Sequence, residues 1–256
     1  MTKSLILFDI DGTLLQSDIN QIPDSTILAL TKLKAAGHDL GIATGRPLYL
    51  VDERIRNLPV NVFITANGQH ILYNNDVIYE NPIPSEVVQS LIDEAKALNI
   101  PIGLVSSNQS AVTVQTEGVL ESFKRVSMPL PSVGTDLHHK ESILQAWFFS
   151  NEFEQLQEKY ETHLKFVPWL EFGADVVPLN GSKAEGIKYL MTHLDEVPKR
   201  LITFGDGYND LEMLELADIG VAMGNAHDDV KLRADFVTKR IDEDGIYHAC
   251  EILDLF

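Results

Sequence analysis

Short apolar runs alternate with helix-like segments at both ends of this chain, and this alternation restricts the fold more than any other feature. In the N-terminal part the runs cover residues 5–8, 40–43 and 62–65. Toward the C-terminus the pattern resumes with runs at 201–204 and 219–222. Parallel strands that are buried on both faces give such runs, and each parallel connection needs a crossover, which is usually a helix. We therefore predict an α/β fold with a doubly wound, mostly parallel sheet.

The segments between these runs supply the helices and further strand signals. Residues 71–73 and 77–79 flank Asn74-Asn75-Asp76, which is typical of a hairpin, and residues 236–237 fit a last short strand. Helices are predicted over residues 24–36, 47–57, 182–194, 208–216 and 226–233.

Two proline-containing stretches divide the chain. Asn81-Pro82-Ile83-Pro84 and Pro178-Leu179-Asn180-Gly181 disfavour both helix and central strand, so they are predicted connectors. Between them the sequence indicates a helix, two strands, a short helix, a strand at 143–149, a helix at 152–163 and two final strands. We predict that residues 1–80 and 181–256 form one core, and that residues 81–180 form an inserted α+β domain.

Composition excludes several classes of protein. The 256 residues include 20 basic and 38 acidic side chains, which gives a net charge of −18 at pH 7. Such a surface repels nucleic acid and anionic lipid, so neither is expected as a partner. Cys250 is the single cysteine, which rules out an intrachain disulfide and a thiolate metal cluster. No apolar run reaches the length of a signal peptide or a membrane span, and we expect a cytoplasmic protein.

Two carboxylates follow directly on the first apolar run, in Asp9-Ile10-Asp11-Gly12-Thr13. Ligand sites of doubly wound sheets lie beyond the carboxyl ends of the strands. In extended chain, residues two apart point to the same side with about 7 Å between their Cα atoms, so Asp9 and Asp11 can face one site. Gly12 permits a turn and a close backbone approach. The structural alternative is a solvated loop with a turn at Asp11-Gly12.

A second polar segment, Thr44-Gly45-Arg46, follows the run at 40–43. Its hydroxyl and its N–H groups at the start of a predicted helix suit an anion. An ordinary helix cap would use the same residues.

Two more segments lie in the C-terminal part. Lys183 opens a predicted helix, where a positive charge opposes the helix dipole, so a bound phosphate explains it better than local stability does. Asp206, Asn209 and Asp210 follow the run at 201–204 and offer the hard oxygen ligands that suit Mg²⁺. The structural alternatives are a surface lysine and a capped helix with acidic residues in its first turn.

In a parallel sheet all these strand ends share one edge, and together they supply a nucleophile, metal ligands, a hydroxyl donor and a fixed cation for phosphoryl transfer. The ordered set resembles the haloacid dehalogenase superfamily. With the insertion between its second and third motifs, it is similar to the Cof-type sugar-phosphatase branch. The motifs that carry the resemblance are residues 9–13, Thr44-Gly45-Arg46, Lys183 and residues 205–210, with Asn67-Gly68 and Met223-Gly224-Asn225-Ala226 in support.

The resemblance implies a Mg²⁺-dependent phosphatase for small phosphorylated metabolites, with sugar phosphates as the leading class. Asp9 would be the nucleophile that forms an aspartyl-phosphate, and Asp11 would be the general acid and base. The implied metal ligands are Asp9, the backbone carbonyl of Asp11, Asp206 and Asp210, the last either directly or as a support. The implied phosphate-binding residues are Thr44, Gly45, Arg46, Lys183 and Asn209.

Other readings stay open at this level. A phosphomutase would use the same nucleophile, and a catalytically silent module could bind a phosphorylated metabolite without turnover. Pyridoxal phosphate, flavin mononucleotide and nucleotides are alternative substrates. The insertion would be a mobile cap in which Trp147, Trp169 and Phe172 either contact a substrate ring or pack in a core. His138-His139 gives a weak metal signal, and the sequence does not indicate an oligomeric state.

Overall fold

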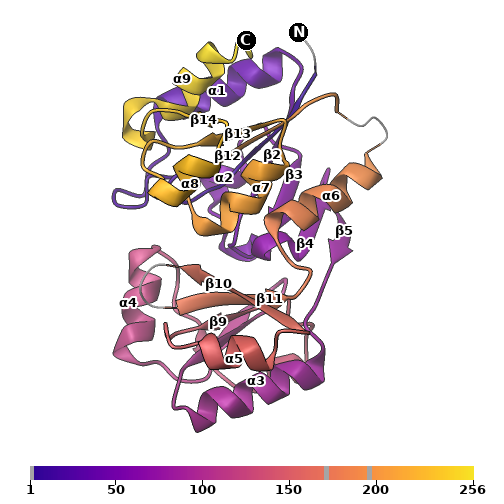
Figure 1. The fold of residues 1–256 in the computed structure, drawn as a ribbon, viewed down its shortest axis with the longest axis vertical. Helices are drawn as coiled ribbons and strands as arrows, with labels where there is room; N and C mark the ends of the chain where they lie inside the picture. The colour runs from indigo at the N-terminus through magenta and orange to yellow at the C-terminus, as the bar shows by residue number, and fades with distance from the viewer. Residues whose placement is uncertain (1–2, 170–172, 195–197) are drawn as a thin grey trace.

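The computed structural model describes residues 3–169, 173–194 and 198–256, which form two sheets with their helices, one above the other along the long axis (Figure 1). One sheet has eight strands in the order β14-β13-β12-β1-β2-β3-β4-β5, and the other has six in the order β10-β11-β9-β6-β7-β8. The larger sheet takes its strands from both ends of the described chain and the smaller one takes its strands from the middle.

The eight-stranded sheet confirms the predicted fold class. Its parallel strands are β1 (Leu5–Phe8), β2 (Asp39–Ala43), β3 (Val62–Thr65), β12 (Leu201–Gly205), β13 (Ile219–Ala222) and β14 (Phe236–Val237). The predicted hairpin forms the antiparallel edge as β4 (His70–Tyr73) and β5 (Asp76–Glu80). Strand β1 lies centrally, because it pairs with β12 on one side and with β2 on the other.

Alternate residues of β1 anchor helices on opposite faces of this sheet, as the two-residue repeat of a strand requires. Ile6 and Phe8 pack in one apolar cluster with α1 (Asp24–Ala35) and α9 (Gly245–Ile252). Leu5 and Leu7 pack in another with α6 (Lys183–His193) and α7 (Leu211–Leu216). Both faces are covered, which explains why β1 is apolar at every position.

The six-stranded sheet is built from β6 (Ile102–Val105), β7 (Ser110–Val112), β8 (Ser132–Val133), β9 (Gln145–Phe148), β10 (Leu164–Trp169) and β11 (Gly173–Pro178). Its helices are α3 (Ser85–Ala97), α4 (Glu117–Arg125) and α5 (Glu154–Lys159). Ala146 and Phe148 of β9 pack in the cluster that holds α3 and α5 residues, whereas Trp147 packs with α4 residues. Asp175 is the register partner of Trp147, so its side chain lies on the same face of the sheet.

One helix prediction was wrong in detail, and one helix was not predicted. The helix predicted over 47–57 is a 3-10 turn (Leu48–Leu50) followed by α2 (Glu53–Arg56). Val51 and Asp52 between them have extended backbone, and the Asp52 carboxylate accepts a hydrogen bond from the Arg54 N–H to start α2 afresh. Helix α9 was not predicted, and its apolar side chains pack in the cluster that also holds α1.

The remaining helices follow the predictions with shifts at their ends. The segment 208–216 begins as a 3-10 turn (Tyr208–Asp210) before α7, and the helix predicted over 226–233 is α8 (Asp228–Arg233). Ser182 caps α6 by accepting from the Glu185 N–H. Among the described residues no helix has the length and apolar character that crossing a membrane requires.

The loop after β3 lies against the start of α6, and Gly68 makes this approach possible. Gly68 has φ +92°, and a Cβ at this position would lie 2.1 Å from the Ser182 carbonyl oxygen. Gly37, after α1, has the same φ of +92° but meets no atom within 4 Å. A side chain at Gly37 would therefore meet backbone strain alone, whereas a side chain at Gly68 would meet both backbone strain and a steric clash.

We predict that Gly68→Ala destabilises the protein much more than Gly37→Ala does. Gly37→Ala should cost about 1 kcal/mol of unfolding free energy, because only the left-handed backbone is strained. Gly68→Ala should cost roughly 3 kcal/mol or more, since the new methyl group also displaces the α6 start. Urea denaturation of both variants measures the difference, and equal losses would contradict this account of the loop.

Candidate active site

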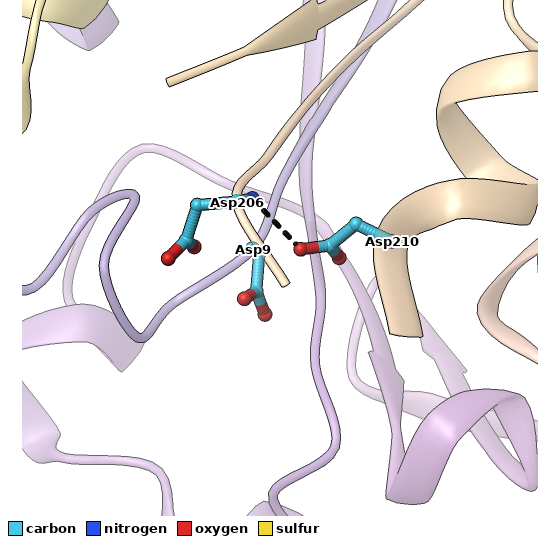
Figure 2. Close-up of side chains that lie close together, drawn as sticks. All are labelled: Asp9, Asp206 and Asp210. Atoms are coloured by element: carbon cyan, nitrogen blue, oxygen red, sulfur yellow. Dashed lines mark hydrogen bonds between the residues drawn. The ribbon is translucent and has the colours of Figure 1, made fainter. Parts of the chain in front are cut away.

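Three carboxylates meet at the carboxyl edge of the eight-stranded sheet. Asp9 follows β1, Asp206 follows β12, and Asp210 ends the 3-10 turn before α7. One ligand oxygen from each lies within 4.8 Å of the others, and Figure 2 shows the three side chains close together. The parallel pairing of β1 with β12 brings these residues together from opposite ends of the chain.

Lys183 compensates part of this negative charge. It is fully buried, and its Nζ donates to Asp9 Oδ1 at 2.8 Å and to Asp210 Oδ1 at 2.6 Å. Burial alone would lower the pKa of Lys183, but the charges of Asp210 and Asp9 outweigh it and raise that pKa above its ordinary value. Lys183 is therefore a permanent internal cation.

Asp210 also holds the loop that carries Asp206. Its Oδ2 accepts from the backbone N–H groups of Asp206 and Gly207, both at 2.9 Å, and Figure 2 draws the first of these bonds. Gly205 leaves room for this arrangement, because a Cβ there would lie 2.5 Å from Asp210 Cγ. Asp210 thus fixes both the lysine and the neighbouring loop.

The carboxylates retain an excess of negative potential. Burial, together with the charges of Asp210 and Asp11, raises the pKa of Asp9 to about 7 against the lowering effect of Lys183. Burial and the charges of Asp9 and Asp210 likewise raise the pKa of Asp206 well above its ordinary value. Clustered carboxylate oxygens that resist ionisation together fit a divalent cation, which would neutralise them.

Asp11 lies apart from this cluster and pairs with Arg46. Arg46 Nε and Nη2 donate to the two carboxylate oxygens of Asp11 at 2.7 and 2.6 Å, which is a bidentate ion pair. The same guanidinium donates to the carbonyl of Leu50. It also donates to the carbonyl of Val126, which lies between the two connectors. The side chain predicted to bind phosphate is thus engaged with the predicted general acid and base.

The predicted phosphate-binding residues surround one cavity with the carboxylates. The cavity has a volume of about 400 Å³, and Asp9, Asp206, Thr44, Gly45 and Asn209 all line it, as do Asp11 and Arg46. Lys183 and Asp210 do not line the cavity. They lie behind it, where Lys183 hydrogen-bonds with both Asp9 and Asp210. The structure therefore brings every predicted site residue to one place.

Two residues near the cluster were given no role by the sequence. Thr13 Oγ1 donates to Asp206 Oδ1 at 3.0 Å, and Asn225 Nδ2 donates to the Gly12 carbonyl at 2.8 Å. Gly12 itself approaches so closely that a Cβ there would lie 2.1 Å from Asp206 Oδ2. Thr13 lies in the motif of residues 9–13 and Asn225 lies in the motif of residues 223–226. Membership of these motifs was the only sequence signal that could have indicated a role for them.

The six-stranded sheet supplies the opposite wall of the cavity. That wall is largely aromatic and includes Phe123, Trp147, Phe149 and Trp169, and the carboxyl of Asp175 lines the cavity close to Gly45. Trp147 also packs in an apolar cluster with Phe123, which confirms the packing alternative for this tryptophan. Phe172 lies outside the described residues.

His138 and His139 are not part of this site. Their rings stack with centroids 3.9 Å apart, and His138 Nε2 hydrogen-bonds with Gln89 on α3. Both line a separate hollow beside Pro82 and Pro84. The weak metal signal of this pair gains no support from the described residues.

This geometry defines an enzyme that acts on phosphate monoesters, because it combines a carboxylate open to a cavity with a cation site and a fixed ammonium group. Comparison with known proteins agrees. The chain belongs to the haloacid dehalogenase-like hydrolases, a family that matches residues 6–250. It is a phosphoric monoester hydrolase of that superfamily.

Individual relatives cover the whole chain. YkrA of Bacillus subtilis, which is provisionally named a phosphatase, is 38% identical over 256 residues, covering 100% of this chain and 99% of its own. The pyridoxal phosphate phosphatase YbhA of Escherichia coli is 28% identical, covering 93% of both chains. The solved structure of a subclass IIB sugar phosphatase is 33% identical and covers 100% of both chains with a TM-score of 0.90.

We predict that Asp9→Asn becomes stabilising relative to the wild type as the pH rises, provided that divalent cations are absent. The pKa of Asp9 is about 7 in the folded protein against an ordinary value of 3.8, so the folded state holds a proton that the unfolded state has released. Between these values the wild type loses about 1.4 kcal/mol of stability per pH unit from this group, and the asparagine variant does not.

Urea denaturation in chelator at pH 5, 6 and 7 measures this difference. Saturating Mg²⁺ should remove it by stabilising the ionised wild-type site. A stability difference that stays constant from pH 5 to 7 would contradict the assigned direction of the Asp9 pKa.

Proposed function

We propose that this chain is a Mg²⁺-dependent phosphatase that hydrolyses small phosphorylated metabolites through an aspartyl-phosphate on Asp9. The observation that carries the proposal is the position of Asp9. Its carboxylate lies in the three-carboxylate cluster, accepts a hydrogen bond from Lys183, and lines the cavity where a substrate would bind. A nucleophile needs both this access and this electrostatic support.

The donor set fits a hard divalent cation. Asp9, Asp206 and Asp210 would hold it, together with the backbone carbonyl of Asp11, and Gly12 brings that backbone against Asp206. When bound, Mg²⁺ would neutralise the charge repulsion between the nucleophile and a phosphate dianion.

The chain's own residues account for the remaining steps. Asp9 attacks phosphorus and the bond to the leaving oxygen breaks, while Asp11 donates a proton to that oxygen. Asp11 then takes a proton from the water that hydrolyses the aspartyl-phosphate, which restores both groups. Thr44, the Gly45 N–H and Asn209 line the cavity and would hold phosphoryl oxygens, and Lys183 would stabilise the charge on Asp9.

The ion pair between Arg46 and Asp11 belongs to the same cycle. Arg46 engages both carboxylate oxygens of Asp11, so the pair must loosen before Asp11 can reach a leaving group. A phosphate dianion in the cavity would compete for the same guanidinium. Substrate binding would thereby both anchor Arg46 and release Asp11 for acid catalysis.

Residues 81–180 would act as a cap on a core made of residues 1–80 and 181–256. The connectors at 81–84 and 178–181 join the two sheets, and the aromatic wall of the cavity comes from the cap side. Closure would exclude water, and the cap residues would choose the substrate. Sugar phosphates are the leading class, since a sugar ring can stack its C–H face on aromatic side chains.

We predict that Asp9→Asn lowers kcat by at least about a thousandfold while the protein stays folded, because the variant has no nucleophile. Phosphate release from a panel of phosphorylated metabolites, with Mg²⁺ and with EDTA, measures the loss. Asp18→Asn is the matched control, since it removes an equal charge from an exposed position of the same loop.

Three results would contradict the proposal. Metal-dependent turnover retained by Asp9→Asn would remove Asp9 from the nucleophile's role. Phosphate release that requires a bisphosphate activator would indicate a phosphomutase, and binding without turnover in the wild type would indicate a silent binding module.

We predict that sugar phosphates exceed acetyl phosphate in kcat/KM by about tenfold or more, because only the larger substrates reach the aromatic wall. Trp169→Leu should reduce this advantage by raising KM for the sugar phosphates, with the rate on acetyl phosphate unchanged. Pyridoxal phosphate belongs in the panel because the aromatic wall also suits a planar ring. A flat preference across the panel would contradict selection by this wall.

A further inference from the structure

The loop Ala66–Gly68 is the most strained backbone near the cavity. Ala66, Asn67 and Gly68 have φ values of 49°, 51° and 92°, so three successive residues adopt left-handed conformations. Such a conformation is unfavourable for alanine and persists only where the surroundings impose it. Strain of this kind commonly marks a side chain that must be held in one place.

Backbone contacts hold this loop against the phosphate-binding segment. The N–H of Asn67 donates to the Thr44 carbonyl, and the N–H of Ala66 donates to the Arg46 carbonyl, both at 3.0 Å. Because Gly68 lies against the Ser182 carbonyl, the loop also contacts the residue next to Lys183. The loop is thus fixed to the core on two sides of the site.

The Asn67 side chain projects from this loop and bridges the two sheets. It is only 2% exposed. Its Nδ2 donates to Gln145 Oε1 at 3.0 Å and to Asp175 Oδ2 at 2.7 Å, which belong to β9 and β11. Its Oδ1 accepts from Asn209 Nδ2 at 3.0 Å, in the turn before α7. Since the Asp175 carboxylate offers acceptors, this orientation of the amide satisfies all three neighbours.

The cap acceptors are themselves held in position. Gln145 Nε2 donates to Asp175 Oδ1 at 3.0 Å and reaches the Gly45 carbonyl at 3.4 Å. Asp175 is half-buried, and the loss of solvent around its carboxyl raises its pKa to about 7 against the lowering effects of the Asn67 hydrogen bond and the charge of Lys183. A carboxyl withdrawn from water depends on such partners, so its contacts with Asn67 matter for the closed arrangement.

The same loop contacts the connector between the sheets. Gln69 Nε2 donates to the Asn67 carbonyl at 2.7 Å, and Gln69 Oε1 accepts from Asn81 Nδ2 at 2.8 Å. Asn81 begins the first connector and also donates to Asn180 in the second at 3.3 Å. A movement of the connector at Asn81 would therefore shift Gln69, which hydrogen-bonds with the Asn67 backbone.

From these contacts we propose that Asn67 is a positioning residue that couples closure of residues 81–180 to the placement of Asn209 at the phosphate site. The inference rests on the proposed phosphatase function. With the cap closed, Gln145 and Asp175 orient the Asn67 amide so that its oxygen faces Asn209. With the cap open, that amide loses both acceptors and Asn209 loses an oriented partner. Productive phosphate binding is thereby reserved for the closed state.

Asn67→Gly tests the proposal without adding backbone strain, because glycine accepts the left-handed conformation. We expect kcat/KM for a sugar phosphate to fall by roughly tenfold to a hundredfold, mainly through kcat. Lys165→Met is the matched control, since Lys165 on β10 also bridges the sheets through Glu212 but lies at the surface. The control should stay within about twofold of the wild type.

A double-mutant cycle separates coupling from a merely structural role. In the wild type, Asp175→Ala and Asn209→Ala should be non-additive in kcat/KM by roughly a factor of three or more, and in the Asn67→Gly background they should be additive. Asn67→Asp should also lose activity, because its carboxylate faces that of Asp175. Adding Asp175→Asn should recover part of the loss, since one donor–acceptor pair is restored.

Solution scattering of the metal-free protein gives a readout that needs no activity. Asn67→Gly should increase the radius of gyration relative to the wild type and to Lys165→Met, because the closed arrangement loses its internal bridge. Additivity in both backgrounds, or unchanged kcat/KM together with unchanged scattering, would overturn the proposal. Should the wild type hydrolyse no substrate, the proposed function fails and scattering alone decides the role of Asn67.

Discussion

The buried ammonium of Lys183 between Asp9 and Asp210 is the interaction on which the rest of the site depends. Three carboxylates within 4.8 Å repel one another, and the protein interior weakens that repulsion much less than water does. Removing one partner of a buried ion pair typically costs about 3–5 kcal/mol, because a charge is left uncompensated. Lys183 therefore lowers the electrostatic cost of burying the three carboxylates together. The negative charge that remains uncompensated favours the binding of a cation.

The two sheets line the cavity with different kinds of side chain. The eight-stranded sheet provides charged and polar groups, while the residues of the six-stranded sheet and its helices provide an aromatic wall and the half-buried carboxyl of Asp175. This division matches two needs of a phosphatase, since the reaction with phosphate is constant and the leaving group varies. The hydrogen bonds of Asn67 join the two parts, because its side chain contacts Gln145 on β9, Asp175 on β11 and Asn209 in the turn before α7.

Much of the site was predictable because its residues follow apolar strands in short, distinctive motifs. Asp9, Thr44 and Asp206 each come directly after a buried strand, and the parallel order of the sheet places them at one edge. Thr13 and Asn225 received no role, since threonine and asparagine in loops are common and their partners are distant in sequence. Asp175 lies in an apolar strand of the insertion, where a single acidic residue gives no local signal. Helix α9 was missed for a similar reason, because its apolar side chains obtain their meaning only from packing on α1.

The sequence by itself determined the class of fold, the segments that form the core strands and the residues at their carboxyl ends, because strand periodicity and motif spacing are local properties of the chain. Only the tertiary structure decided that Arg46 pairs with Asp11, that Lys183 is wholly buried, and that Asn67 bridges the two sheets. These facts depend on distances between residues far apart in sequence, and on burial, which strengthens each charge–charge contact. No local pattern encodes either quantity, so they became visible only when the two ends of the chain and its middle were brought together.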